Sequence, residues 1–234
     1  MKFLSLDTST CNSVVSVSNQ EGVIFGERRL FEKGRCDGLL SLVGHCLKKA
    51  KTKIEEVDFF AAGIGPGSFT GLRIGISVVK ALNYALSKSC LAFSSLDAIA
   101  YNEMLFQRQQ LCVCVDAKRS NVYCRFYAFD KNKKLRPVSG DLLLAQDVFL
   151  KRVNSDMALA GDALCLWKQK LPPELKRAQL MDEEFWYPTP QSLFRLTLES
   201  YKDGRPLDCF ALNAKYLYEK DCQVHRSAKV LKKG

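Results

Sequence analysis

A glycine-rich run in the first third of the chain carries residue types that often contact anions in proteins. It spans residues 63–75, holds five of the 14 glycines and reads G-I-G-P-G-S-F-T-G-L-R-I-G. The two glycines that flank Pro66 can take backbone angles closed to other residues, and the fixed φ of Pro66 makes the bend between them rigid. Ser68 or Thr70 can cap a following helix, whose first backbone N–H groups are then able to receive a phosphate.

The same run also allows a purely structural interpretation. It lacks the Gly-Lys-Ser/Thr of a Walker loop, and its glycine spacing differs from the dinucleotide-binding fingerprint. Gly71 and Gly75 lie four residues apart, so they remove side chains from one helix face and let another backbone come close. The residues alone therefore leave two interpretations open: a phosphate-binding loop, or a tight turn followed by a closely packed helix.

The sequence on either side of the run indicates the elements that hold it. Residues 57–62 are apolar and aromatic, which is typical of a buried strand. After the run, apolar residues recur at helical spacing and leave one polar stripe. The apolar positions are Leu72, Ile76, Val79 and Leu86, with Ile74, Val78, Leu82 and Ala85 beside them, and the polar stripe is Arg73, Ser77, Lys80 and Tyr84. We predict a strand, a glycine-rich turn and a mostly buried helix.

Two segments of the chain follow the same plan. The apolar strand 3–7 closes on Asp7, the apolar strand 111–116 closes on Asp116, and a polar turn and further strands follow each. The repeat predicts two related lobes that meet near residues 104–110. Before the second copy of this plan begins, we expect strands at 2–6, 14–17, 23–30, 57–62 and 90–93. We expect helices after Asp37, from Thr70 to Ser87, and from Ser94 or Ser95 towards Phe106.

The second copy of this plan is reduced. Residues 157–160 and the Gly161-Asp162 pair fit its strand and turn, but no second glycine-rich loop follows, and residues 193–201 form a last amphipathic helix. The plan resembles the α/β architecture of actin, sugar kinases and Hsp70 (ASKHA, ribonuclease H-like), whose enzymes hold ATP between two duplicated lobes beside the first aspartate. We expect a first lobe at residues 1–107 and a smaller second lobe with a basic tail at 108–234.

The composition is that of an ordinary globular protein, with 47% hydrophobic and 26% charged residues. Asp7 comes too soon for a signal peptide and no apolar run could span a bilayer, so we expect a cytoplasmic protein without membrane association. The ten cysteines are scattered, and the two histidines, His45 and His225, build neither a metal cluster nor a nucleophile–histidine pair. We interpret Cys112 and Cys114, which alternate along a strand, as small buried hydrophobes.

Basic residues outnumber acidic ones and give a formal net charge of +10. Such a balance raises the rate of encounter with nucleic acid or acidic partners. Taken singly, each basic patch also fits a solvated helix end, loop tip or chain terminus. The patches are Lys48, Lys49, Lys51 and Lys53; Lys131, Lys133, Lys134 and Arg136; and Arg226, Lys229, Lys232 and Lys233.

Residues 63–75 closely resemble, without gaps, the signature of the TsaB (YeaZ) family of bacterial tRNA-modification proteins, which belongs to a wider Gcp-like, M22-type glycoprotease-like group. The resemblance is strong over roughly the first 125 residues and loose afterwards. Three other landmarks occur in the family's order: Phe3-Leu4-Ser5-Leu6-Asp7-Thr8-Ser9, Asp116-Ala117-Lys118-Arg119 with Val122-Tyr123, and Tyr216-Leu217.

The resemblance implies a subunit that does not itself catalyse a reaction. Such a subunit docks with TsaD, which makes N6-threonylcarbamoyladenosine at position 37 of tRNAs that read ANN codons, and the ATPase TsaE joins the complex. It implies no cofactor for the isolated chain, ATP or ADP in the complex, tRNA contact through the complex, and a homodimer when TsaD is absent. The implied partner interface is Gly67, Ser68, Phe69, Thr70, Gly71, Leu72, Arg73, Gly75, Ile76 and Val79. The likeness to the actin and sugar-kinase architecture implies nucleotide contacts at Asp7, Thr8 and Ser9.

Two other functions stay open at this stage. A stand-alone nucleotide-dependent enzyme would use Asp7 and Thr8 at the phosphates, and an RNA-binding module would use the basic residues 226–234. The family often has a histidine where this chain has Arg35-Cys36-Asp37, and the metal-binding His-x-x-x-His of TsaD has no counterpart at His45. These departures favour docking over chemistry, and no residues support the older description of the group as proteases.

Overall fold

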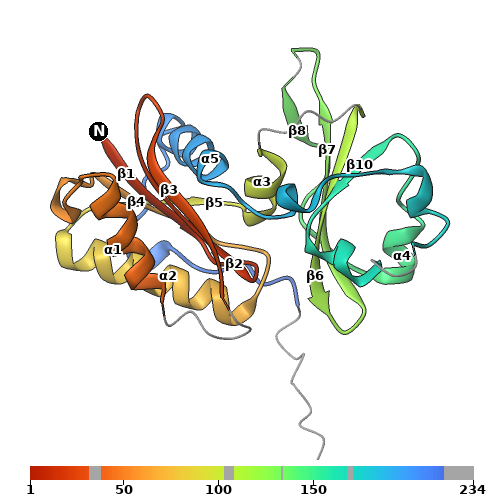
Figure 1. The fold of residues 1–234 in the computed structure, drawn as a ribbon, viewed down its shortest axis with the longest axis horizontal. Helices are drawn as coiled ribbons and strands as arrows, with labels where there is room; N and C mark the ends of the chain where they lie inside the picture. Colours follow the sequence, from red (N-terminus) through yellow and green to blue (C-terminus); the bar gives the residue numbers. More distant parts are fainter. Residues whose placement is uncertain (32–37, 103–107, 133, 168–170, 219–234) are drawn as a thin grey trace, which may run out of the picture.

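The chain folds into two lobes, each built on its own β-sheet (Figure 1). The structure is a computed structural model that describes residues 1–31, 38–102, 108–132, 134–167 and 171–218. The first sheet has the strand order β3-β2-β1-β4-β5, and the second has the order β11-β10-β6-β7-β8, with β9 paired to β7. The first-sheet strands are β1 (Lys2–Asp7), β2 (Asn12–Asn19), β3 (Val23–Leu30), β4 (Phe59–Gly63) and β5 (Ser89–Phe93). The second-sheet strands are β6 (Gln110–Lys118), β7 (Asn121–Phe129), β8 (Leu135–Pro137), β9 (Leu142–Ala145), β10 (Met157–Ala160) and β11 (Gln179–Leu180).

The two sheets repeat one topology, which confirms the duplication predicted from the sequence. In the first, β1 and β3 flank β2 in antiparallel fashion, while β4 is parallel to both β1 and β5. In the second, β6 and β8 flank β7 in antiparallel fashion, while β10 is parallel to both β6 and β11. The fold is therefore the α/β, ASKHA-type arrangement of two duplicated lobes.

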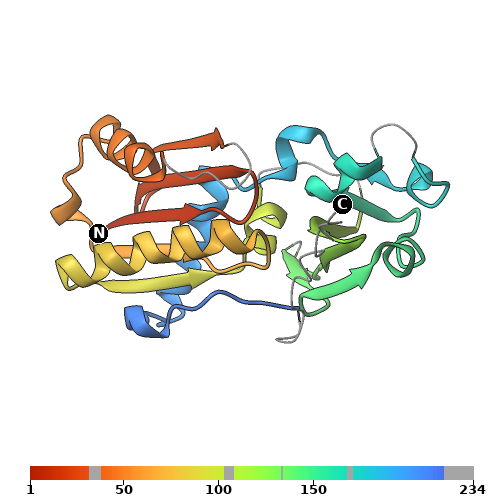
Figure 2. The ribbon, with the colours of Figure 1, turned by 90° about the horizontal axis from the view of Figure 1, so that it is seen from below.

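Helices cover both faces of the first sheet (Figures 1 and 2). Leu4, Leu6 and Val15 point to the face covered by α1 (Leu39–Lys49) and α2 (Phe69–Leu86). Phe3 and Val14, one residue away along the same strands, point to the opposite face. Both sets are almost fully buried, because successive side chains of a strand alternate between the faces of a sheet that is packed on both sides.

Helix α5 (Pro190–Lys202) covers that opposite face, although the predicted boundary assigned it to the second lobe. Thr189 caps the helix, and Leu193 and Leu196 complete the apolar cluster around Phe3. The Thr197 hydroxyl lies 2.8 Å from the Ser5 hydroxyl, also on this face. An amphipathic pattern predicts an apolar face but does not identify the sheet that buries it, so the boundary at residue 108 was wrong for α5.

Two smaller elements complete the layout. Helix α3 (Ser95–Ala100) is capped by Ser94, and Asn102, just beyond its end, donates hydrogen bonds to the carbonyls of Phe185 and Tyr187. The rest of the helix predicted towards Phe106 lies outside the described residues. The other short helix is α4 (Gln146–Leu150) in the second lobe. Cys112 and Cys114 are fully buried, as predicted.

Some of the sequence features lie outside the described residues. These are the Arg35-Cys36-Asp37 segment, Lys133, His225 and the basic residues 226–234. Among the helices that the structure describes, none combines the length and the hydrophobicity needed to cross a lipid bilayer.

Candidate functional site

The turn after β1 (residues 8–11, called the first turn below) packs directly against helix α2. Two glycines of the glycine-rich run make that contact. A Cβ atom on Gly71 would collide with the backbone carbonyl of Thr8, and one on Gly75 would collide with the Thr8 side chain. The Thr8 hydroxyl donates a 2.7 Å hydrogen bond to the Gly71 carbonyl. These two glycines therefore serve a close approach inside the molecule, not the approach of a partner helix that was predicted for them.

Asp7 lies at the centre of this contact and is fully buried. Its Oδ1 accepts hydrogen bonds from the backbone N–H of Ser9 at 2.9 Å and from the Ser9 hydroxyl at 2.6 Å, while Gly63 and Ser95 lie beside Oδ2. Burial raises the pKa of Asp7, although the bonds from Ser9 and Ser95 oppose the shift. Neither Asp7 nor Thr8 lines the interlobe cavity, whereas Ser9 does. Of the three predicted nucleotide contacts, the structure thus brings only Ser9 to the cavity wall.

The other predicted interface residues divide between the core and the surface. Leu72, Ile76 and Val79 are buried against the first sheet and cannot offer apolar area to a partner, because the sheet already covers them. The exposed or half-buried members of the predicted set are Gly67, Ser68, Phe69, Thr70 and Arg73. Tyr84, at the other end of α2, is 77% exposed.

The start of α2 uses part of its hydrogen-bonding capacity internally. The Ser68 hydroxyl accepts from the N–H of Gly71 at 3.2 Å, as an N-cap side chain does. The Ser68 N–H donates to the Ser9 carbonyl at 2.6 Å. The glycine-rich turn is thereby tied to the first turn, which supports the packing interpretation of the run.

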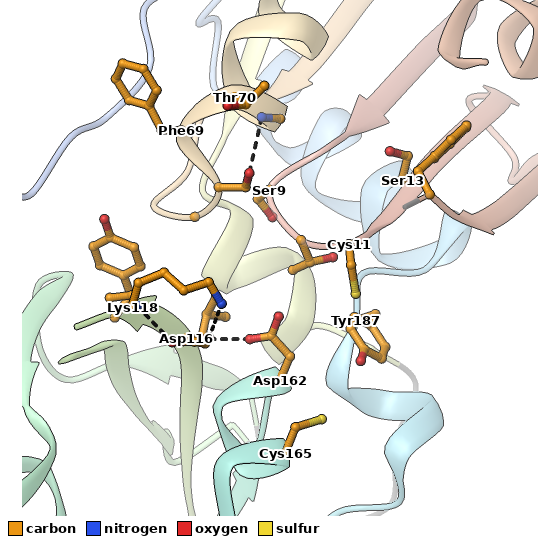
Figure 3. Close-up of a pocket in the computed structure, with 18 of the residues that line it drawn as sticks. Ser9, Cys11, Ser13, Phe69, Thr70, Asp116, Lys118, Asp162, Cys165 and Tyr187 are labelled. Atoms are coloured by element: carbon orange, nitrogen blue, oxygen red, sulfur yellow. Dashed lines mark hydrogen bonds and ion pairs between the residues drawn. The ribbon is translucent and has the colours of Figure 1, made fainter. Parts of the chain in front are cut away.

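A cavity of about 770 Å³ lies between the lobes (Figure 3). Its first-lobe wall is formed by the turn after β1 and the start of α2, and its second-lobe wall by the β6–β7 hairpin and residues 162–166. Six aromatic residues line it together with hydroxyl and charged groups. The aromatic residues are Phe31, Phe69, Tyr123, Tyr187, Tyr216 and Tyr218, and the polar ones include Ser9, Thr10, Ser13, Ser68, Thr70, Asp116, Lys118, Arg119 and Asp162.

Two carboxylates lie on the second-lobe wall (Figure 3). Asp162 accepts a 2.9 Å hydrogen bond from the Asp116 N–H, and the Asp116 side chain is paired with Lys118. Burial and the nearby Asp116 charge raise the pKa of Asp162. Lys118, Arg119 and Ser120 all have positive φ at the tip of the hairpin, a conformation that costs energy for residues with a Cβ.

Opposite this wall, the side chains of Cys11 and Tyr187 lie next to each other (Figure 3). Burial raises the pKa of both the Cys11 thiol and the Tyr187 phenol, so both groups are neutral at physiological pH. Within the part of the chain that the structure describes, no group of three or more His, Cys, Asp and Glu side chains is arranged to hold a metal ion.

The segment after α5 runs from the first lobe to the second (Figure 2), and its residues Tyr216 and Tyr218 line the cavity. The Lys215 N–H donates to the Ile64 carbonyl in the first lobe at 2.8 Å, and its ammonium group donates to Asp141 in the second lobe at 2.6 Å. The Tyr218 hydroxyl donates to the Ala117 carbonyl at 2.9 Å. We call residues 212–218 the strap, since they hold the two lobes together.

Comparisons with known proteins agree with this arrangement. The family model of TsaD, described as tRNA N6-adenosine threonylcarbamoyltransferase, matches residues 36–173, more than half of the chain. The tRNA threonylcarbamoyladenosine biosynthesis protein TsaB of Escherichia coli is 22% identical over 212 residues, which cover 88% of this chain and 89% of that protein. YeaZ from Pseudomonas aeruginosa superimposes with a TM-score of 0.76 at 26% identity over 92% of this chain and 99% of that one.

The chain belongs to the TsaD family and, within it, to the TsaB (YeaZ) group. TsaB of Bacillus subtilis adds a match of 28% identity over 174 residues, 73% of this chain and 75% of that protein. In this TsaB-group chain, the sequence predicted the glycine-rich turn and the first turn as separate features, but not the contact between them. It also missed Asp162, Tyr187 and the strap as cavity residues, because only the fold brings them to the start of α2.

Proposed function

We propose that this chain is a partner subunit, without chemistry of its own, that docks with and activates a TsaD-type threonylcarbamoyltransferase during N6-threonylcarbamoyladenosine synthesis on tRNA. The names of the TsaB relatives support the pathway. The first turn packs inside the molecule, which supports a role in which the partner, and not this chain, carries out catalysis. Asp7, the aspartate that the fold's nucleotide enzymes place beside ATP, is here fully buried and bonded to Ser9. A carboxylate used in this way supports the turn and is not presented to a ligand.

The outer face of α1 and α2 supports a docking role. Both helices lie on the same side of the first sheet (Figure 1). Large side chains remain exposed on them, with Leu40 of α1 63% exposed and Tyr84 of α2 77% exposed. Exposed aromatic and apolar residues on adjacent helices are typical of protein–protein contacts. We propose this face for the TsaD-type partner, and for a second copy of the chain when the partner is absent; TsaE would join the assembled pair.

The structure decides which mutation can test this face. Gly75→Arg would strike Thr8 and disturb the fold, whereas Ser77 is exposed in the middle of α2. Ser77→Arg should weaken binding to the cognate TsaD-type protein at least about tenfold, because a long charged side chain separates packed helices. Gln191→Arg, exposed on α5 across the sheet, is the matched control and should bind normally.

Titration calorimetry of the two purified proteins, without RNA, measures the effect. Circular dichroism and thermal unfolding establish that both variants are folded. If Ser77→Arg and Gln191→Arg bind the partner equally well, the outer face of α1 and α2 is not the docking surface.

A further inference from the structure

A cluster of two aromatic rings and a guanidinium group stands at the mouth of the interlobe cavity. Phe69 and Tyr216 lie with ring centroids 5.1 Å apart, and the Arg73 guanidinium lies 3.9 Å from the centre of the Phe69 ring. Arg73 also donates a 3.2 Å hydrogen bond to the Tyr216 hydroxyl, which fixes the three side chains together. Even so, Phe69 is 52% exposed and Tyr216 is 46% exposed.

The cluster is ordered before any ligand arrives. Phe69 comes from the first turn of α2, whereas Tyr216 comes from the strap, so the fold itself brings them together. Rings that are held rigid yet half exposed leave apolar area uncovered, which points to an interaction partner. Aromatic rings and guanidinium planes are the surfaces on which proteins stack unpaired nucleobases.

The cavity behind the cluster has the size and the polar groups for a base. Its volume of about 770 Å³ lies within the range of small-molecule sites and is too small for a double helix. The side chains of Asp116 and Asp162 supply acceptors, which suit the exocyclic amino groups of bases and disfavour phosphates inside the cavity. Lys118 is paired with Asp116 but is 66% exposed at the rim, so its ammonium group can also contact a phosphate outside the cavity.

We propose that this cluster and the cavity behind it bind single-stranded RNA, with one unpaired base stacked on Phe69 and Tyr216 and its neighbour inserted between the lobes. The formal net charge of +10 favours the approach of a polyanion. The inference rests on the proposed function only in taking the natural RNA to be tRNA. The isolated chain should bind single-stranded RNA by itself.

The test uses the full-length chain and a short, fluorescently labelled, single-stranded RNA of mixed sequence, with anisotropy as the readout. Phe69→Ala and Tyr216→Ala should each weaken binding by about five- to a hundredfold, the range found when a stacking residue is removed. Phe210→Ala is the matched control, because Phe210 is a 73% exposed aromatic residue outside the cavity lining, and it should leave binding unchanged.

Conservative variants separate stacking from packing. Phe69→Leu keeps an apolar side chain at the site but removes the ring, so it should bind as poorly as Phe69→Ala. Tyr216→Phe keeps the ring and loses only the bond from Arg73, so it should retain most of the affinity. Lys118→Asn should lower the salt dependence of binding by about one counterion; asparagine is chosen because Lys118 has a φ of +64°.

Four results would each overturn the inference: equal affinity for the same RNA in duplex form, equal affinity for free mononucleotides, normal binding by Phe69→Ala and Tyr216→Ala, or full rescue by Phe69→Leu. Loss of RNA binding only after removal of residues 226–234 would assign binding to the tail instead. The calorimetric docking experiment contains no RNA, so failure of the proposed function and failure of this inference are seen separately.

Discussion

Where the first lobe places the Asp7 carboxylate against Gly63, the second lobe places the backbone of Cys114 against Gly161. The sheet registers make these positions equivalent, since Leu6 pairs with Ala62 in one lobe and Val113 pairs with Ala160 in the other. The sequence repeat had aligned Asp7 with Asp116, but Asp116 lies two residues further along a longer strand. One topology thus carries a buried carboxylate in one lobe and a buried thiol in the other.

The two lobes differ again after the equivalent glycines. Gly63 leads into a turn and the 18-residue helix α2, whereas Gly161 leads into the short 3-10 helix Asp162–Trp167. The first lobe surrounds its aspartate with hydroxyl groups from Ser9 and Ser95. The comparison teaches that the repeated backbone does not require the carboxylate; the local hydrogen-bond donors decide whether one can be buried.

The largest effect is expected from giving the second lobe the first lobe's carboxylate. Cys114→Asp should reduce the free energy of unfolding by about 4 kcal/mol, because the site is fully buried and offers no matching hydroxyl donors among its described contacts. Cys114→Ser is the control and should lose only about 1 kcal/mol, since its hydroxyl can donate to the Ala160 carbonyl. Urea unfolding measures both; equal losses would contradict the comparison.

A second test fills the space between the first turn and α2. Gly71→Ala should cost about 3 kcal/mol, because its Cβ meets backbone atoms of Thr8, and Gly75→Ala somewhat less, because it meets side-chain atoms. Gly44→Ala on α1 meets no atom within 4 Å and should stabilise the protein by about 0.5–1 kcal/mol through helix propensity. Thermal unfolding reports the order, and a Gly71→Ala variant as stable as Gly44→Ala would exclude the close contact.

A third test follows the charge of Asp7 with pH. Burial raises its pKa above the ordinary value of an aspartate, so folding favours the protonated carboxyl and the stability that Asp7 contributes is lost as pH rises through the raised folded pKa. Relative to Asp7→Asn, the wild type should therefore become less stable with rising pH above about 4, by at most about 1.4 kcal/mol per pH unit. A difference that is independent of pH would show that Asp7 is not desolvated.

The smallest effect is expected at the strap, where the lobes are joined. Tyr218→Phe removes the bonds to the Ala117 carbonyl and from the Asn121 amide, and should cost about 1 kcal/mol. Hydrogen exchange should show faster exchange at the β6–β7 hairpin and an unchanged first sheet. Faster exchange throughout both lobes would mean that the strap supports the whole fold and not the lobe junction alone.

The elements that local pattern controls could be predicted from the sequence. The apolar strand pattern of residues 2–6 and the helical spacing after Thr70 located β1 and α2, and the repeated strand–Asp–turn pattern revealed the duplication. The direction in which α2 turns its glycines could not be predicted, since Gly71 and Gly75 permit close approach by any backbone. The sheet that α5 covers and the cavity residues Asp162 and Tyr216 depend on contacts between distant segments, which no local pattern encodes.

Reconstituted tRNA threonylcarbamoylation, with the cognate TsaD-type and TsaE-type proteins and the adenylate-forming enzyme, tests the proposed function most directly. Modification should require this chain, and the isolated chain should neither turn over ATP nor modify tRNA. Asp7→Asn, provided that it folds, should support modification like the wild type, because the carboxylate only braces the first turn. Full modification without the chain, or ATP turnover by the chain alone that Asp7→Asn abolishes, would contradict the account.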